Sequence, residues 1–314
     1  MAREIKVVSN AKHAKAIILS SDFTTYSMAD RYRDLMRRTN VDFNAAITLL
    51  EHLPVFIDGD SHQRIRKLMA KQISRTKSDQ LSAATEVLPL LVQKTFMLAR
   101  DTELIAEFCQ PLWRAISATI VPPNEATLEL VDAIPGLFSP VLSIRERVKI
   151  NDLIANFMEE QPVDRDDELI LVCLAALGAR PFVGSLGLSL WAIFQRNEGL
   201  NLSEVSWPAI FPSSSLTYVD RIHSRQVDSS LSFATGDRVR CITQHEGYSC
   251  EENRSSLFGF GAHTCLGKSI SEKVWGLVGK ELSRVKLRAN CRSIVMSPHN
   301  DPFQMPGRIE IRME

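Results

Sequence analysis

Residues 258–267, FGFGAHTCLG, combine three glycines, one histidine and one cysteine within ten positions. Glycines at this spacing let the backbone turn tightly and approach a flat ligand closely, because they carry no Cβ atom. A helical pattern begins at Lys268, so Cys265 would lie beside helix amide groups that stabilise a thiolate. A thiolate held against a flat macrocycle is a known ligand of heme iron. The segment therefore predicts a cysteine loop that binds heme.

Other uses of a glycine-rich loop before a helix fit this segment less well. A phosphate-binding loop ends in a lysine and a serine, as Lys268-Ser269 does, but its glycines are spaced differently. A dinucleotide-binding loop needs a preceding strand and a later acidic residue. A cysteine that serves only as a small buried apolar side chain is a further alternative. The density of glycine, histidine and cysteine favours the heme loop over all of them.

The loop resembles the heme-binding signature of the cytochrome P-450 superfamily, F-G-x-G-x-H-x-C-x-G, and matches it at every fixed position. The resemblance implies heme b, iron protoporphyrin IX, as the cofactor. It also implies a mainly α fold with a small β part, and Cys265 as the iron ligand. The other loop residues that would bind the cofactor are Phe258, Gly261, His263 and Gly267.

A second segment carries the same resemblance. Residues 58–68, DGDSHQRIRKL, are similar to the family's D-P-P-x-H-x-R-x-R-x-L segment. His62 and Arg66 are four residues apart and share one helical face, so both can donate to one carboxylate. The resemblance implies that they bind the heme propionates, together with Arg221 on a strand and His263 in the loop. The alternative is a solvated basic helix face, which is the usual role of such charges.

The long central helix departs from the family pattern. Ordinary members carry G-x-[DE]-T-T there, and its acid and alcohol deliver protons to dioxygen. Residues 175–183 are AALGARPFV and contain neither group. Arg180 stays charged at neutral pH and cannot be the proton source.

Arg180-Pro181 resembles the Arg-Pro pair of the peroxygenase branch, which uses hydrogen peroxide and holds a substrate carboxylate through the arginine. The resemblance implies that Arg180 and Pro181 are catalytic residues, and we expect the proline to open the helix locally and leave space above the iron. In the alternative, Arg180 pairs with a protein carboxylate and Pro181 only kinks the helix.

Two further departures concern the surroundings of the loop. The family's E-x-x-R pair is matched best by Glu204-Val-Ser-Trp207, with tryptophan in place of arginine, and Arg254 is a weak substitute. We also expect a fold that is shortened at the N-terminus and internally, because the match begins near the family's second helix. A reduced proximal face would weaken the binding of a redox partner and favour peroxide. Apolar surface exposed by the shortening would favour a homo-oligomer.

Composition restricts the partners and the compartment. Lys and Arg number 37, as do Asp and Glu, so the formal net charge is zero and nucleic acid is disfavoured. The six cysteines lack metal-type spacing and favour a cytoplasmic setting, with a disulfide between Cys241 and Cys250 as the open alternative. The N-terminus has no apolar signal core. The apolar stretch 169–194 has Arg180-Pro181 at its middle, which favours a buried helix over a membrane span.

Helical periodicity dominates the chain, and strand-like segments occur late. The predicted helices are Asn10–Leu19, Met28–Arg38, Phe43–His52, Ser61–Ser74, Leu81–Leu98, Thr102–Ser117, Asn124–Ile134, Ile144–Glu159, Asp167–Phe194 and Gly267–Arg284. The predicted strands are Leu216–Arg221, Asp237–Thr243, Val285–Ala289 and Arg308–Met313.

Together these features predict a cytoplasmic heme-thiolate oxidoreductase that forms one domain over residues 1–314. The expected reaction is a peroxide-dependent oxidation, or a rearrangement at heme, of a small organic substrate that bears a carboxylate. Substrates of secondary metabolism or fatty-acid-like molecules are the expected class. Two alternatives stay open: a monooxygenase supplied with dioxygen and with electrons from ferredoxin and NAD(P)H, and a heme-binding partner protein that performs no turnover.

Overall fold

A computed structural model describes residues 5–122, 124–160, 165–224, 233–244, 256–297 and 302–314. Clustering of contacts divides the chain into two compact units, each assembled from three segments. Unit 1 consists of Met1–Ala70, Glu129–Cys173 and Leu216–Cys265, and unit 2 of Lys71–Leu128, Leu174–Ser215 and Leu266–Glu314. A single domain over the whole chain stays a prediction.

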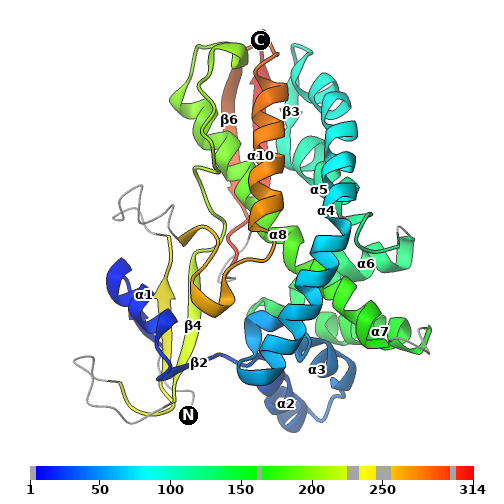
Figure 1. The fold of residues 1–314 in the computed structure, drawn as a ribbon, viewed down its shortest axis with the longest axis vertical. Coiled ribbons are helices and arrows are strands. Elements are labelled where there is room, and N and C mark those ends of the chain that lie inside the picture. The colour runs from blue at the N-terminus through cyan, green and yellow to red at the C-terminus, as the bar shows by residue number, and fades with distance from the viewer. Residues whose placement is uncertain (1–4, 123, 161–164, 225–232, 245–255, 298–301) are drawn as a thin grey trace. The chain divides into compact units, whose positions relative to one another are not determined.

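Unit 1 contains a four-stranded sheet of order β1-β5-β4-β2, in which β1 pairs with β5 in parallel and the other pairs are antiparallel. The strands are β1 (Lys6–Val8), β2 (Phe23–Thr25), β4 (Tyr218–His223) and β5 (Arg238–Ile242). Helix α1 (Ala11–Leu19) buries Ala14 and Ile17 against Val239 and Cys241 of β5. Figure 1 shows α1 in blue beside the yellow strands. This packing fixes β2 and β4, which carry two residues of the candidate site.

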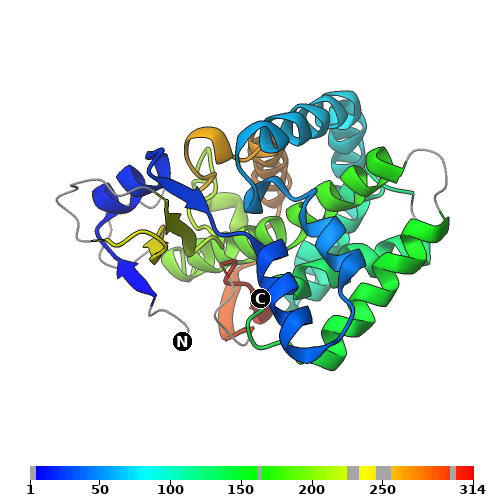
Figure 2. The ribbon, with the colours of Figure 1, turned by 90° about the horizontal axis from the view of Figure 1, so that it is seen from below.

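The helical part of unit 1 contains α2 (Met28–Thr39), α3 (Asn44–Leu50) and α7 (Ile144–Glu160). Asn151 of α7 accepts a hydrogen bond from the backbone N–H of Ala46 in α3 at 3.1 Å. In Figure 2 the blue helices α2 and α3 lie next to the green helix α7. The short 3-10 helices of this unit are Pro54–Phe56, Ile134–Phe138 and Gly261–His263.

Unit 2 contains a three-stranded antiparallel sheet of order β3-β7-β6. Its strands are β3 (Asp101–Glu103), β6 (Ala289–Met296) and β7 (Pro306–Met313). Its other elements are the π-helix Ile105–Cys109, α5 (Gln110–Ser117), the 3-10 helix Leu202–Glu204 and α10 (Lys268–Leu282), whose Trp275 is fully buried. Helix α6 (Glu125–Ala133) spans the boundary between the units, as do α4 (Gly59–Phe96) and α8 (Arg165–Arg196).

The structure corrects three predicted elements. Ser61–Ser74 and Leu81–Leu98 form one helix, α4, because the polar residues between them suit a helix, and Gln80 there donates to Thr76 at 2.8 Å. Predicted helix Thr102–Ser117 begins with strand β3, since the Glu103 carboxylate caps the turn that follows by accepting from Ile105 and Ala106.

Predicted strand Val285–Ala289 is also wrong. The carbonyls of Val285 and Leu287 accept hydrogen bonds from Ser203 and Leu202, and the strand begins only at Ala289. Strands β1 and β2 were not predicted, because three residues are too short for a periodic pattern.

By length and composition alone, residues Asp167–Arg196 of α8 could cross a membrane. However, 56 % of the most apolar window of this helix is buried inside the protein. The core helix of a soluble protein passes the same test, so the span is weak evidence for a membrane.

Candidate functional site

The cysteine loop is a closed turn of unit 1. The Cys265 N–H donates to the carbonyl of Phe258 at 2.7 Å, which ties the two ends of the loop together. Gly259 and Gly261 have φ angles of +71° and +60°, a left-handed conformation that glycine adopts without strain. The Cys265 side chain is exposed and forms no disulfide with a described residue. The loop therefore presents this sulfur outward from a backbone that two glycines make possible.

The sequence predicted that the loop glycines allow close approach to a flat ligand. In the structure, the side chain of Leu19 occupies the space beside Gly261. A Cβ atom built on Gly261 would lie 2.7 Å from Cδ2 of Leu19, at the end of α1. Gly261 is thus favoured chiefly by its φ angle, because the Leu19 side chain is 53 % exposed and its end can move.

His62 and His263 lie together beside the loop. The ring centroids are 4.3 Å apart, and His263 Nε2 lies 3.1 Å from Oδ1 of Asp58. His62 is 4 % exposed, and its Nε2 atom has no hydrogen-bond partner among the residues that the structure describes. A buried imidazole nitrogen without a partner costs free energy unless a ligand supplies one.

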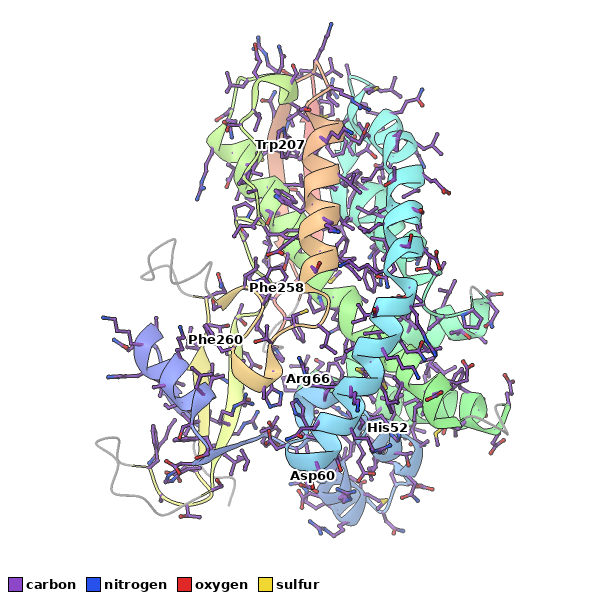
Figure 3. The ribbon with its side chains drawn as sticks, viewed as in Figure 1. His52, Asp60, Arg66, Trp207, Phe258 and Phe260 are labelled. Carbon is purple, nitrogen blue, oxygen red and sulfur yellow. The ribbon has the colours of Figure 1, made fainter. Side chains whose placement is uncertain are left out.

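Two arginines complete this cluster. Arg66 donates to the carbonyl of Thr264 at 2.7 Å, so α4 holds the residue next to Cys265. Arg221 on β4 is only 3 % exposed and donates to Thr25 Oγ1 at 3.4 Å, but it pairs with no carboxylate in the described ranges. Figure 3 shows Arg66 on α4, and Phe258 and Phe260 on the loop. The structure thus brings His62, Arg66, Arg221, His263 and Cys265 into one unit.

The pKa values in this cluster reflect burial and an excess of positive charge. Burial, His263 and Arg66 together lower the pKa of His62 to about 4. Burial lowers the pKa of Arg66, although Cys265 acts to raise it. Burial also lowers the pKa of Arg221, although Asp58 acts to raise it. Burial acts to raise the pKa of Asp58, but hydrogen bonds from His263 and Thr25 outweigh it and hold the pKa well below its usual range.

This donor set fits a heme. Two propionates would satisfy the guanidinium of Arg221 and the orphan nitrogen of His62, which are buried with unused hydrogen-bonding capacity. Within the described parts of the chain, no three His, Cys, Asp or Glu side chains lie close enough to hold a bare metal ion. A single exposed cysteine beside donors for two carboxylates suits one ligand position of an iron that a macrocycle already binds.

The protonation of His62 predicts how stability depends on pH. Its pKa falls from 6.5 to about 4 on folding, so the unfolded chain binds more protons between these values. The cofactor-free protein is expected to lose stability as the pH falls from 6.5 toward 4, and His62→Gln should reduce this loss. Thermal melts at pH 7 and pH 5 measure it, with a shift of about 2–4 °C for each kcal/mol. The exposed His13 supplies the control, His13→Gln, and equal pH dependence in both variants would contradict the assignment.

Arg180 and Pro181 lie in unit 2, on α8. Helix α8 continues from Arg165 to Arg196 with Pro181 inside it, so the proline does not end the helix, and the local opening stays a prediction. A segment after the helix supports it at this point. The Ser215 hydroxyl donates to the Pro181 carbonyl at 3.2 Å, and the Ser215 N–H donates to Ser185 Oγ at 3.0 Å.

The predicted space near this part of the helix is partly filled. The Trp113 ring of α5 packs against Gly178, where an added Cβ atom would lie 2.8 Å from Cζ2 and closer still to Cη2. Trp113 also contacts Phe182, with ring centroids 5.4 Å apart. The indole of Trp113 thus occupies the notch that Gly178 leaves.

Gly178→Ala is expected to destabilise the protein by about 1–3 kcal/mol, because the indole of Trp113 must move. Gly276→Ala on α10 is the matched control, since nothing lies within 4 Å of an added Cβ there. It should stabilise by up to about 1 kcal/mol through helix propensity. Urea unfolding measures both values, and adding Trp113→Phe should recover part of the loss at Gly178. A Gly178→Ala variant as stable as Gly276→Ala would contradict the overlap.

The best match to the E-x-x-R pair has a different structural role. Glu204 accepts a hydrogen bond from the N–H of Asn201 at 2.8 Å and caps a short 3-10 helix. Trp207 packs on Trp275 of α10, with ring centroids 6.2 Å apart, and Figure 3 labels it in unit 2. An aromatic contact thus stands where the family has an ion pair. Arg254 lies outside the described residues.

The remaining cysteines differ from Cys265 in their surroundings. Cys109, Cys173 and Cys241 are buried, and burial raises the pKa of each thiol, to about 12 for Cys241. Cys291 is half-buried, and burial raises its pKa to about 11. Cys250 lies outside the described residues, so the Cys241–Cys250 alternative is not tested.

Sequence reasoning missed two residues of the cluster, Thr25 and Asp58. Asp58 opens the matched segment 58–68, but the pattern gave it no role. Thr25 has no sequence signal, because only the pairing of β2 with β4 brings it next to Arg221.

No protein-family model matches the sequence, and no curated protein matches it significantly. Solved structures do match. P450BioI, in complex with an acyl carrier protein ligated to hexadec-9Z-enoic acid, has a TM-score of 0.77 and 16 % identity, over 98 % of this chain and 91 % of that chain. CalO2 has a TM-score of 0.75 and 15 % identity, and the match covers 100 % of this chain and 91 % of that chain.

Epothilone B-bound cytochrome P450epoK matches with a TM-score of 0.72 and 11 % identity, over 98 % of this chain and 91 % of that chain. Identities this low carry information on the fold but not on the reaction. The mainly α architecture with a small β part, expected from the cysteine loop, is confirmed by these matches. The chain has the cytochrome P450 fold.

Proposed function

We propose that this protein binds heme b and oxidises a small organic molecule. Cys265 would be the iron ligand, and His62, Arg66, Arg221 and His263 would bind the propionates. The observation that carries the proposal is the set of buried donors beside the exposed Cys265 thiol: Arg221 without a carboxylate partner in the described ranges, and His62 Nε2 without an acceptor there. The low identity of the structural matches leaves the cofactor as part of the proposal.

The heme, when bound, would supply the activation of an oxygen donor. The protein side chains would do the rest. Phe258, Gly261 and Gly267 would shape the loop that presents the thiolate, and the arginines would neutralise the propionates. Arg180 would hold a substrate carboxylate, which favours hydrogen peroxide over dioxygen with a reductase. Support for this finer assignment comes from the sequence AALGARPFV, which contains no acid or alcohol.

The substrate class follows from two facts. The guanidinium group of Arg180 is always charged and can donate two parallel hydrogen bonds, so it suits a carboxylate. Two of the structurally similar proteins are recorded with an acyl carrier protein ligated to hexadec-9Z-enoic acid and with epothilone B, and the first of these ligands carries a long apolar chain. We therefore propose an apolar molecule that bears a carboxylate, handled in the cytoplasm.

Reconstitution tests the proposal. Purified protein is titrated with hemin, reduced and exposed to carbon monoxide, and a thiolate-type Soret band is expected. Product formation is then compared with hydrogen peroxide alone and with a ferredoxin, its reductase and NADPH. If the holoenzyme is active only with the reductase system, the protein is a monooxygenase and not a peroxygenase. A protein that takes up no heme would refute the proposal.

A further inference from the structure

Asp58 lies where three segments of unit 1 meet: strand β2, the start of α4 and the cysteine loop. Its Oδ2 accepts a hydrogen bond from the N–H of Thr25 at 2.5 Å. Its Oδ1 lies 3.1 Å from Nε2 of His263. One carboxylate thus joins segments that are far apart in the sequence, and each oxygen has its own partner.

Thr25 strengthens the same junction. Its hydroxyl lies 3.4 Å from Nε2 of His263 and accepts a hydrogen bond from Arg221 at 3.4 Å. Thr25 is itself buried, at 9 % exposure. His263 therefore has a carboxylate and a hydroxyl on one nitrogen, and the His62 ring beside it. These contacts hold the His263 imidazole in one position.

We propose that Asp58 is a positioning residue, which fixes His263 and through it the cysteine loop in the arrangement that receives the cofactor. This inference rests on the proposed function. Asp58 acts through His263, because its own charge has the same sign as a propionate and would repel it. The contact between Arg66 and the Thr264 carbonyl is the second connection between α4 and the loop. Removing Asp58 would leave the Arg66 hydrogen bond, the His62 ring and the Thr25 hydroxyl to hold the loop, without the carboxylate that joins it to the backbone of β2.

The charges of the cluster agree with this role. Arg66 and Arg221 supply two permanent positive charges, which match the two negative charges of a pair of propionates. Asp58 pairs with His263, so it is not available to neutralise either arginine at hydrogen-bond distance. Asp58 still attracts Arg221 electrostatically, but it leaves the hydrogen-bond donors of both arginines available to an anionic group.

Hydrogen exchange of the cofactor-free protein tests the role without any turnover. Asp58→Ala removes both contacts, and amides of residues 258–265 are expected to exchange about tenfold faster. Asp58→Asn should restore most of the protection, because its oxygen can accept from Thr25 while its amide donates to a neutral His263. Asp60→Asn is the matched control, since Asp60 lies two residues from Asp58 and is exposed. Its side chain forms no hydrogen bond or ion pair within the described structure.

Hemin affinity gives the second measurement. Asp58→Ala is expected to bind hemin about tenfold more weakly than Asp60→Asn, and Asp58→Asn to lie close to the control. If Asp58→Ala does not fold, Asp58→Ser takes its place, because a single hydroxyl on a shorter side chain cannot keep the contacts with both Thr25 and His263. Exchange and affinity equal to the Asp60→Asn control would overturn the inference, as would an Asp58→Asn variant no better than alanine. Failure of the unmodified protein to bind hemin would instead overturn the proposed function.

Discussion

Replacing Cys265 by alanine is expected to abolish the thiolate-type spectrum of the reduced carbonyl complex. Cys265 is the exposed cysteine among those that the structure describes, and it belongs to a loop that hydrogen bonds to Phe258 and Arg66 hold in place. The buried cysteines have raised pKa values and cannot readily supply a thiolate at neutral pH. Weak hemin binding is expected to remain, because the donors to the propionates are intact.

The matched control is Cys291→Ser. Cys291 is half-buried, its thiol contacts the Trp191 carbonyl at 3.8 Å, and the sequence predicts no role for it. Absorption spectra of both variants, recorded after hemin titration, reduction and exposure to carbon monoxide, decide the ligand. A Cys265→Ala variant with the spectrum of the unmodified protein would show that another residue binds the iron. Loss of the spectrum in Cys291→Ser as well would indicate a folding defect.

The sequence predicted which side chains lie near the loop better than it predicted the contacts around them. The motif at 258–267 and the His62–Arg66 spacing indicated which side chains should meet, and the structure brings them together with Arg221 and His263. These positions are predictable because glycine conformation and helical spacing are local properties. Their roles toward a cofactor stay predictions.

The features of the site that the sequence missed depend on contacts between distant segments. Thr25 joins the cluster only through strand pairing, and Trp113 meets Gly178 only because α5 packs on α8. The contact at Pro181 has the same origin. A proline removes the hydrogen bond to the carbonyl four residues earlier, that of Leu177, whereas the Ser215 hydroxyl, 34 residues away in sequence, donates to the carbonyl of Pro181 itself. Helical rules predict the lost hydrogen bond but not the contact with Ser215.

Arg180→Ala is expected to lower peroxide-driven turnover of a carboxylate substrate by about a hundredfold or more, because misplacement of a reacting group costs this much. The effect should depend on the substrate. Oxidation of a neutral analogue should change much less, since it has no carboxylate for the guanidinium to hold. Turnover of both substrates with hydrogen peroxide, measured on holoenzyme with equal heme content, makes the comparison.

Two further variants separate position from charge. Arg180→Lys keeps the positive charge but loses the bidentate fork, so an intermediate rate is expected. Arg196→Ala removes an exposed arginine from the last turn of the same helix and should leave turnover unchanged. Because α8 continues through Pro181, a substrate carboxylate must reach Arg180 beside a continuous helix, and the Trp113 ring already packs against Gly178. Equal loss of acidic and neutral substrate oxidation in Arg180→Ala would therefore assign this arginine to the stability of the helix, and remove it from substrate binding.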